Sequence, residues 1–281
     1  MVTFLQRTFT SLVHTHAGRT QGELDEALQA LQQAIRKEPS NAKFRVFLSQ
    51  LLCVIGEWER ALSQLDVAGD LDPLNLPMAQ TYREAIRCEL FRNKVFTGDK
   101  SPLIFGDPPE WTAFLIEALR LSGAGEYVQS EKLRSQAFEL APGSVGSIDE
   151  QPFEWIADAD SRIGPVMEAI VNGRYYWIPM QRLKQVDIDP PEDLRDMVWA
   201  PAHLIFENEG EAVALIPARY PATESSSDPA LKLSRKTEWQ EPFEGLYTGL
   251  GQRMLATNLD EYPLLSTRQI LFQASSDSEA E

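Results

Sequence analysis

One spacing recurs three times in the first half of the amino-acid sequence. A glycine is followed seventeen residues later by a proline, and an alanine stands twelve residues after the glycine. The three segments with this spacing are Gly22 to Pro39, Gly56 to Pro73 and Gly125 to Pro142. The first two begin at residues 22 and 56, an offset of 34 that also relates Leu28 to Leu62. Repetition at a fixed offset predicts a fold built from similar stacked units.

An offset of 34 residues is the period of tetratricopeptide units, helix–turn–helix pairs that cannot bury their apolar faces alone. Stacked helix pairs build concave surfaces that bind other proteins, so the first half points to binding rather than catalysis. The third segment begins 69 residues after the second, which is two periods plus one residue, and we therefore expect an imperfect array. Apolar spacing predicts helices over residues 3–17, 23–37, 42–55, 58–71, 77–96, 110–121 and 126–140.

The second half of the chain has the pattern of short strands. Asn172-Gly173 separates two β-prone runs, and such a pair supplies the positive φ angles of a type I′ hairpin turn. We expect strands within residues 166–178, 202–216, 246–248, 253–257 and 264–272. These strands predict an α+β domain with a small antiparallel sheet or a partly open barrel.

Residues 141–147 are rich in Pro, Gly and Ser and mark the best domain boundary. We expect an all-helical tetratricopeptide-like domain over residues 1–147 and the α+β domain over residues 148–274. Residues 275–281 are acidic and lack large apolar side chains, so we expect a disordered tail there. The predicted fold class is therefore multidomain, with a helical array followed by an α+β unit.

Acidic residues outnumber basic ones, and the excess is concentrated in the second half. The chain has 42 Asp and Glu against 26 Lys and Arg, a formal net charge of −16. Residues 1–148 have 18 acidic and 15 basic residues, whereas residues 149–281 have 24 and 11. This charge argues against nucleic acid and anionic membranes as partners. It fits a partner with a basic patch, and it also fits simple solubility.

The two cysteines, Cys53 and Cys88, stand in apolar helical runs and are too few for a disulfide framework. We expect both to be buried free thiols in a reducing compartment. Residues 1–9 lack the long apolar core of a signal peptide, and no run approaches the ~18 apolar residues of a membrane span. We therefore expect a cytoplasmic protein.

In tetratricopeptide arrays the first helix of each pair lines the concave face. The register of the repeats predicts that this face presents six residues to a partner: Lys43, Val46, Gln50, Thr112, Leu115 and Leu119. Cys53 shares the face with the first three. The alternative is that these side chains pack against the C-terminal domain.

Three carboxylates, Glu154, Asp158 and Asp160, crowd a short stretch around Trp155. Paired carboxylates serve in acid–base chemistry or bind a divalent ion. They also cap helices or pair with arginines, here Arg162. The sequence has no P-loop, no nucleophile elbow and no Cys/His arrangement suited to catalysis. We predict no catalytic residue, metal site or cofactor, and keep a metal-dependent enzyme or regulator using these carboxylates as the alternative.

Several segments together resemble a known protein family. The most specific is the ten-residue run from Phe153 to Arg162. Others are Asn172 to Trp177, Pro191 to Asp196, Pro217 to Pro221 and Gly251 to Leu255. On these segments the chain resembles the ImpE family, also called TagJ or SciE-type proteins, which are accessory components of bacterial type VI secretion. The resemblance extends over nearly the whole chain.

The resemblance implies a cytoplasmic protein with a helical N-terminal half, an α+β C-terminal half and no established enzymatic activity. It offers no catalytic residues to transfer. It implies binding to an N-terminal helix of the small subunit of the contractile sheath, an influence on sheath assembly or recycling, and an indirect link to the sheath-disassembly ATPase. The leading hypothesis is therefore a non-catalytic adaptor.

Overall fold

The computed structural model describes residues 22–273 of the chain. The helix expected over residues 3–17 and the acidic tail over residues 275–281 lie outside the described residues. Six long helices match the remaining predicted ones to within one or two residues at each end. They are α2 (Gly22–Lys37), α3 (Ala42–Ile55), α4 (Trp58–Leu71), α5 (Leu76–Phe96), α6 (Glu110–Gly123) and α7 (Tyr127–Leu140).

The helix ends follow from local chemistry. The Asn41 side chain accepts a hydrogen bond from the Lys43 backbone N–H, which satisfies one of the free donors at the start of α3. Gly56 ends α3 with a φ of +82°, a left-handed conformation that glycine adopts without a steric penalty. Its N–H donates to the carbonyls of Leu52 and Cys53.

The main sheet has nine strands in the order β1-β6-β5-β9-β8-β7-β14-β2-β3. The pair β1–β6 is parallel and every other neighbouring pair is antiparallel. Its strands are β1 (Leu103–Ile104), β2 (Gly146–Ile148), β3 (Gln151–Phe153), β5 (Val166–Val171), β6 (Arg174–Pro179), β7 (Leu183–Ile188), β8 (Trp199–Phe206), β9 (Glu211–Pro217) and β14 (Gln269–Phe272).

Two smaller sheets complete the second half. One is the hairpin of β10 (Thr237–Phe243) and β11 (Leu246–Gly251), and the other has the order β13-β12-β4. The latter strands are β4 (Ile156–Asp158), β12 (Met254–Thr257) and β13 (Glu261–Pro263). Short helical turns join the strands: η2 (Met180–Arg182), η3 (Leu194–Met197), η4 (Thr223–Ser225), α8 (Pro229–Lys232) and η5 (Leu264–Ser266), while η1 (Pro73–Asn75) joins α4 to α5.

The predicted fold class is confirmed, with a helical repeat region followed by a mixed α and β region. The hairpin β5–β6 turns at Asn172 and Gly173, whose φ angles are +50° and +70°. The second expected hairpin is β8–β9. The sequence left two architectures possible, a small antiparallel sheet and a partly open barrel. In the structure the sheets are open and do not close into a barrel, and the main sheet is larger than expected. The start of the segment expected as a strand over 264–272 forms η5 instead.

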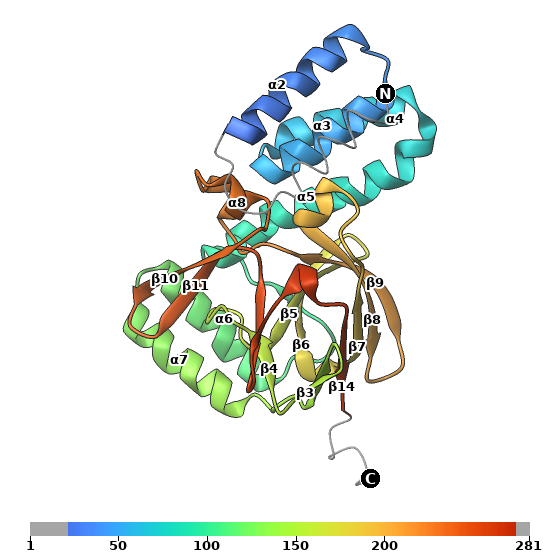
Figure 1. The fold of residues 1–281 in the computed structure, drawn as a ribbon. Helices are drawn as coiled ribbons and strands as arrows, with labels where there is room; N and C mark the ends of the chain where they lie inside the picture. The colour runs from blue at the N-terminus through green and yellow to red at the C-terminus, as the bar shows by residue number, and fades with distance from the viewer. Residues whose placement is uncertain (1–21, 274–281) are drawn as a thin grey trace.

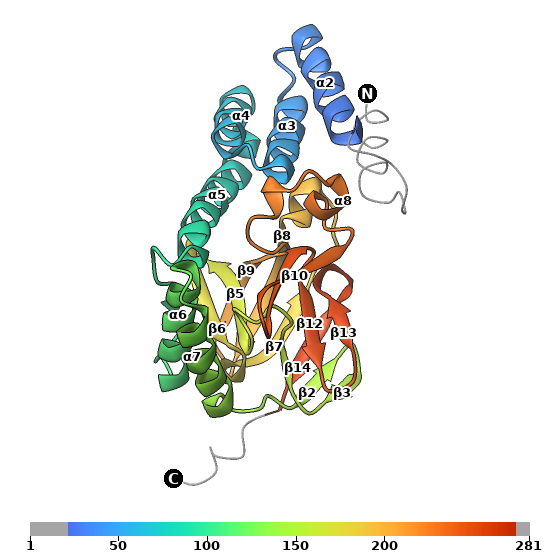
Figure 2. The ribbon, with the colours of Figure 1, turned by 90° about the vertical axis from the view of Figure 1, so that its left-hand side faces the viewer.

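Strand β5 is buried along its whole length because both faces of the sheet are covered. Val166 and Ile170 point to a core shared with α3 to α6, and Met167 and Ala169 point to a second core on the other face. Figures 1 and 2 show α2 to α4 at one end of the molecule, α5 running down to the sheet, and α6 and α7 beside the strands.

The helices and the main sheet are one packed body. The shared core contains Leu51, Trp58 and Ile86 from the helices together with Trp177 and Trp199 from the strands. Strand β1, from the loop between α5 and α6, extends the sheet by pairing with β6. The boundary at residue 147 stays a prediction. Between residues 22 and 273, none of the helices is long and apolar enough to cross a membrane.

Candidate protein-binding surface

The predicted concave face of α3 is largely covered by the second half of the chain. Helix α3 contacts η3, and Gln50 and Cys53 are 5% and 3% exposed. Lys43 is exposed and Val46 is half-buried, so these two side chains remain accessible. On α3 the structure therefore leaves the first turns of the helix open to a partner.

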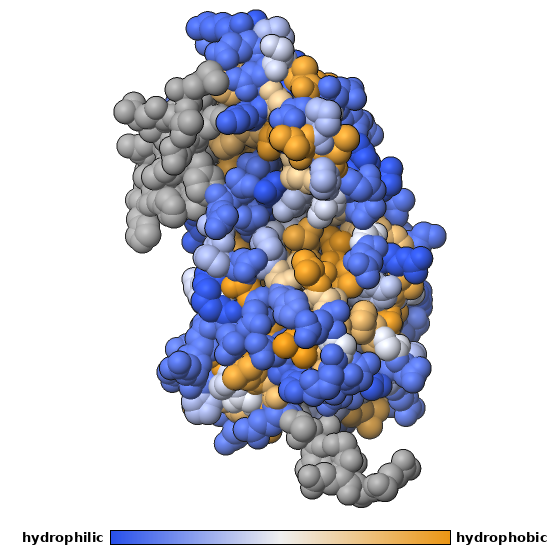
Figure 3. Space-filling view, turned by 90° about the vertical axis from the view of Figure 1, so that its right-hand side faces the viewer, coloured by the Kyte–Doolittle hydropathy of each residue, from blue (hydrophilic) through white to orange (hydrophobic). Residues whose placement is uncertain are grey.

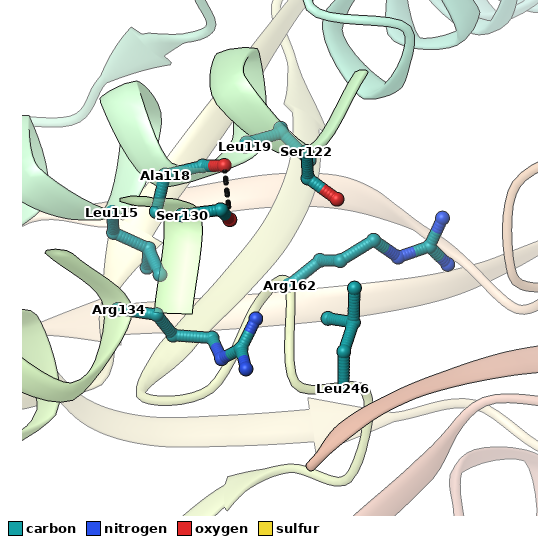
Figure 4. A pocket seen from close by; sticks show the side chains of 8 residues that line it. All are labelled: Leu115, Ala118, Leu119, Ser122, Ser130, Arg134, Arg162 and Leu246. Atoms are coloured by element: carbon teal, nitrogen blue, oxygen red, sulfur yellow. Dashed lines mark hydrogen bonds between the residues drawn. The ribbon is translucent and has the colours of Figure 1, made fainter. Parts of the chain in front are cut away.

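The three predicted residues of α6 are in the interior. Thr112, Leu115 and Leu119 are 1%, 1% and 4% exposed, and the two leucines belong to the core shared with β5 and β6. The space beside the two leucines measures about 10 Å³, which is barely enough for one water. Figure 4 shows the side chains that line it. Ser130 fills part of this region by donating to the Ala118 carbonyl at 2.6 Å. The positions of these three side chains agree with the alternative interpretation, in which they pack against the C-terminal domain. The partner-binding role of the six residues stays a prediction.

Trp199, at the start of β8, joins the repeats to the sheet. Its ring centroid lies 5.9 Å from that of Trp58 on α4 and 6.0 Å from that of Tyr82 on α5. Its indole N–H donates to Glu89 at 3.1 Å. The side chain is fully buried, so it contributes both apolar packing and a satisfied hydrogen bond.

Arg219 follows β9 and holds the end of α3. Its guanidinium donates to the carbonyls of Val54 at 2.7 Å, Cys53 at 3.3 Å and Lys232 at 2.7 Å. The last carbonyls of a helix lack intrahelical partners and carry partial negative charge, so a cation there is stabilising. Burial lowers the pKa of Arg219. Arg219 therefore couples the repeats to the sheet.

A buried ion network lies between α5 and the sheet. Glu168 of β5 is fully buried and accepts from Arg92 at 2.7 and 2.9 Å, from Arg253 and from the Tyr175 hydroxyl. Burial pushes the pKa of Glu168 upward, but the two guanidinium groups and their hydrogen bonds outweigh it and lower the pKa to about 2. Glu168 therefore stays ionised and shares its charge between two buried cations, of which Arg92 also pairs with Glu89 and Arg253 with Asp158.

The carboxylates that the sequence singled out do not form one cluster. Glu154 is exposed, whereas Asp158 and Asp160 are buried. Asp158 accepts from Arg253, the Tyr220 hydroxyl and the backbone N–H of residue 160, and burial raises its pKa to about 6 against the opposing effect of Arg253.

Asp160 accepts from the Arg162 side chain and from the backbone N–H groups of Arg162 and Gly249. The structural pairing predicted for Arg162 is thus present. No group of three His, Cys, Asp or Glu residues within the part of the chain that the structure describes is arranged to hold a metal ion.

Asp158 also lines an open hollow between the end of α7 and β4, which measures about 410 Å³. The lining includes Phe138 and Trp155, which are 39% and 42% exposed. It also includes the small residues Ala157, Gly164 and Ala256. A hollow of this size is within the range of binding pockets in proteins.

Both cysteines are buried free thiols, as predicted. Burial raises the pKa of Cys53 to about 12 and that of Cys88 to about 11. Because the thiolate is the reactive form, we expect both thiols to react with a disulfide reagent at pH 8 at least about 100-fold more slowly in the native protein than in urea. Stopped-flow absorbance would measure the rates; fast labelling of the native protein would show that a thiol is accessible.

The fold and this arrangement of surfaces define a tetratricopeptide-containing α+β protein. The tetratricopeptide repeat model matches residues 19–86, and the ImpE protein model matches residues 150–271. The chain is 50% identical over 252 residues to the type VI secretion system accessory component TagJ of Pseudomonas aeruginosa, covering 90% of this chain and 88% of that protein. This chain belongs to the ImpE family.

A solved structure has the same fold. The X-ray crystal structure of protein VPA1032 from Vibrio parahaemolyticus is similar to this one with a TM-score of 0.82 at 26% sequence identity. The match covers 92% of this chain and 96% of the other. That protein therefore has the same combination of repeat helices and an open sheet.

Proposed function

We propose that this protein is a non-catalytic accessory adaptor of bacterial type VI secretion. The observation that carries the proposal is the 50% identity, over 90% of the chain, with a protein named as an accessory component of that system. The tetratricopeptide helices support the proposal because such helices bind other proteins. The buried carboxylates are engaged with arginines, which gives them a structural role and favours the adaptor over the metal-dependent alternative.

The proposed partner is an N-terminal helix of the small subunit of the contractile sheath, and the proposed consequence is a change in sheath assembly or recycling in the cytoplasm. Any effect on the sheath-disassembly ATPase would be indirect. An amphipathic helix binds by placing apolar side chains one turn apart into a groove. Among the six predicted contacts, Lys43 and Val46, in the first turns of α3, are the two with accessible surface.

Isothermal titration with a synthetic peptide of that helix tests the proposal. We expect saturable one-to-one binding with a Kd below about 100 µM, since short helices in grooves bind with modest affinity. A scrambled peptide of the same composition is the control and should produce no saturable heat. The absence of binding to the native sequence, or equal binding to the scrambled one, would contradict the proposed partner.

A further inference from the structure

We infer that the open hollow between α7 and β4 is the docking site for an amphipathic helix with two large apolar side chains one turn apart and basic residues beside them. The inference rests on the proposed function, which supplies the helix. It assigns the contact to the region where the end of α7 meets the second half of the chain, at the opposite end of the molecule from α2 and α3 in Figure 1.

The size and shape of the hollow suit side chains rather than a small polar ligand. Its volume of about 410 Å³ exceeds what one side chain would occupy, and its lining is mainly Ala, Gly, Pro and the two aromatic residues. Gly164, with a φ of +56°, lies directly under the Phe138 ring, where any larger residue would collide. The hollow therefore combines two partly exposed aromatic side chains with small lining residues, a composition that suits apolar anchor side chains.

Trp155 is unusual among the six tryptophans of the chain. Four are at most 8% exposed, namely Trp58, Trp111, Trp177 and Trp199. Trp239 is 38% exposed but packs against Tyr220, with ring centroids 5.6 Å apart. Trp155, at 42% exposed, borders the hollow instead. Exposed tryptophans of this kind are enriched among residues that dominate binding energies.

The lining of the hollow is rigid before any partner arrives. Asp158 lies within β4 and is held by Arg253 and Tyr220, and Asp160 holds the next turn through Arg162. Pro142 and Pro165 line the hollow and restrict the backbone on either side. A site that is ordered in advance loses little conformational entropy on binding, which favours affinity for a short helix.

The charge around the hollow selects a basic partner. Among the described residues no Lys or Arg lines it. Glu139 and Glu154 are exposed and adjoin the lining residues Phe138 and Trp155 in sequence. The whole chain has a net charge of −16. A helix that brings Lys or Arg beside its apolar residues would therefore be attracted, with an association rate that falls as salt rises.

Other exposed apolar residues lie at the corner between α4 and α5, where Leu71, Leu74 and Leu76 are 39%, 88% and 52% exposed. Figure 3, in which the right-hand side of Figure 1 faces the viewer, shows apolar surface on the upper part of the molecule. Of the two regions, the one between α7 and β4 is hollowed and bordered by aromatic residues, so it offers anchor positions. The leucine corner supplies a matched control.

The test is titration of the sheath-helix peptide into wild-type protein and four variants. Trp155→Ala removes an aromatic lining residue, and Gly143→Leu fills the hollow. Gly143 tolerates a side chain because the nearest atom to an added Cβ is the Glu154 carbonyl oxygen at 3.9 Å. Leu74→Glu is the control on exposed repeat surface, and Lys43→Glu probes the predicted contact on α3. Melting temperatures within 2 °C of wild type, a limit set by about 0.5 kcal/mol for surface changes, would establish that each variant is folded.

We expect both hollow variants to weaken binding at least tenfold and Leu74→Glu to bind as wild type. Wild-type binding that survives Trp155→Ala and Gly143→Leu within twofold would overturn the inference while leaving the proposed function intact, and loss in Lys43→Glu would then place the helix on α3. No binding to wild type would overturn the proposed partner and this inference together. A wild-type dimer that Trp155→Ala dissociates, with peptide affinity unchanged, would show a self-association surface and also overturn it.

Discussion

Glu168→Gln is expected to destabilise the protein by about 3–5 kcal/mol, because the neutral amide leaves two buried guanidinium groups without their shared counter-charge. Arg92 and Arg253 are 1% and 2% exposed, so water cannot replace the lost carboxylate. Urea unfolding at pH 7, followed by circular dichroism, would measure the change. Glu154→Gln, at an exposed carboxylate a short distance along the chain, should change stability by less than about 0.5 kcal/mol.

The same comparison has a defined pH dependence. The pKa of Glu168 is lowered from 4.5 to about 2 in the folded state, so its charge stabilises the fold above pH 4.5. This contribution, about 3 kcal/mol, is lost as pH falls from 4.5 to 2. The stability difference between wild type and Glu168→Gln should therefore narrow over that range. A difference that stays constant down to pH 2.5 would mean that the carboxylate does not act through its charge.

Ionisation of Asp158 changes the stability of the fold in the opposite direction. Burial raises its pKa from 3.8 to about 6, so its ionisation disfavours folding above pH 6, and the penalty is relieved as pH falls from 6 to 3.8. Arg253 donates to both carboxylates, and the charge of Glu168 is one of the causes that raise the pKa of Asp158. The Asp158 penalty is therefore smaller in Glu168→Gln than in the wild type, and it does not cancel from the stability difference between them.

Helices and hairpins could be predicted from the sequence where local chemistry decides them. Asn41 fixes a boundary through its side-chain hydrogen bond, and Gly56 and the pair Asn172-Gly173 do so through their backbone preference. The structure places a cap or a turn at each of these positions. Unpredicted strands include β7 and β10, of six and seven residues, and the shorter β1 and β2, of two and three residues. The pairing of β1 with β6 and of β2 with β14 joins segments far apart in the chain, and local sequence does not specify that pairing.

The burial of the three predicted groove residues of α6 could not be read from the sequence for a related reason. Helical spacing shows that Leu115 and Leu119 share a face, but it does not show what covers that face. In the structure it packs on β5 and β6, more than 40 residues further along the chain. The buried ion network around Glu168 was not predicted from the sequence either, although the sequence contains one indication of it. Glu168 interrupts an otherwise apolar strand, and a charge buried on such a strand needs a partner.

Trp199→Ala is expected to cost about 3–5 kcal/mol, at the upper end for a single core substitution. The indole is fully buried between Trp58 and Tyr82, so its removal leaves a cavity between the repeats and the sheet. It also removes the donor to Glu89, itself 4% exposed. Thermal unfolding followed separately by far-ultraviolet and tryptophan signals would measure the loss.

Because Trp199 lies between the repeats and the sheet, its removal also tests whether these two parts unfold together. Because the helices and the main sheet share one core, the wild-type protein should unfold in a single transition by both signals. In Trp199→Ala, backbone amides of α3, α4 and α5 should exchange faster together with those of β8, which hydrogen exchange would resolve. Val213→Ala is the control, since Val213 is 76% exposed on the neighbouring strand. Two separated transitions in the wild-type protein, or faster exchange confined to β8 in the variant, would mean that the repeats and the sheet are stable independently of one another.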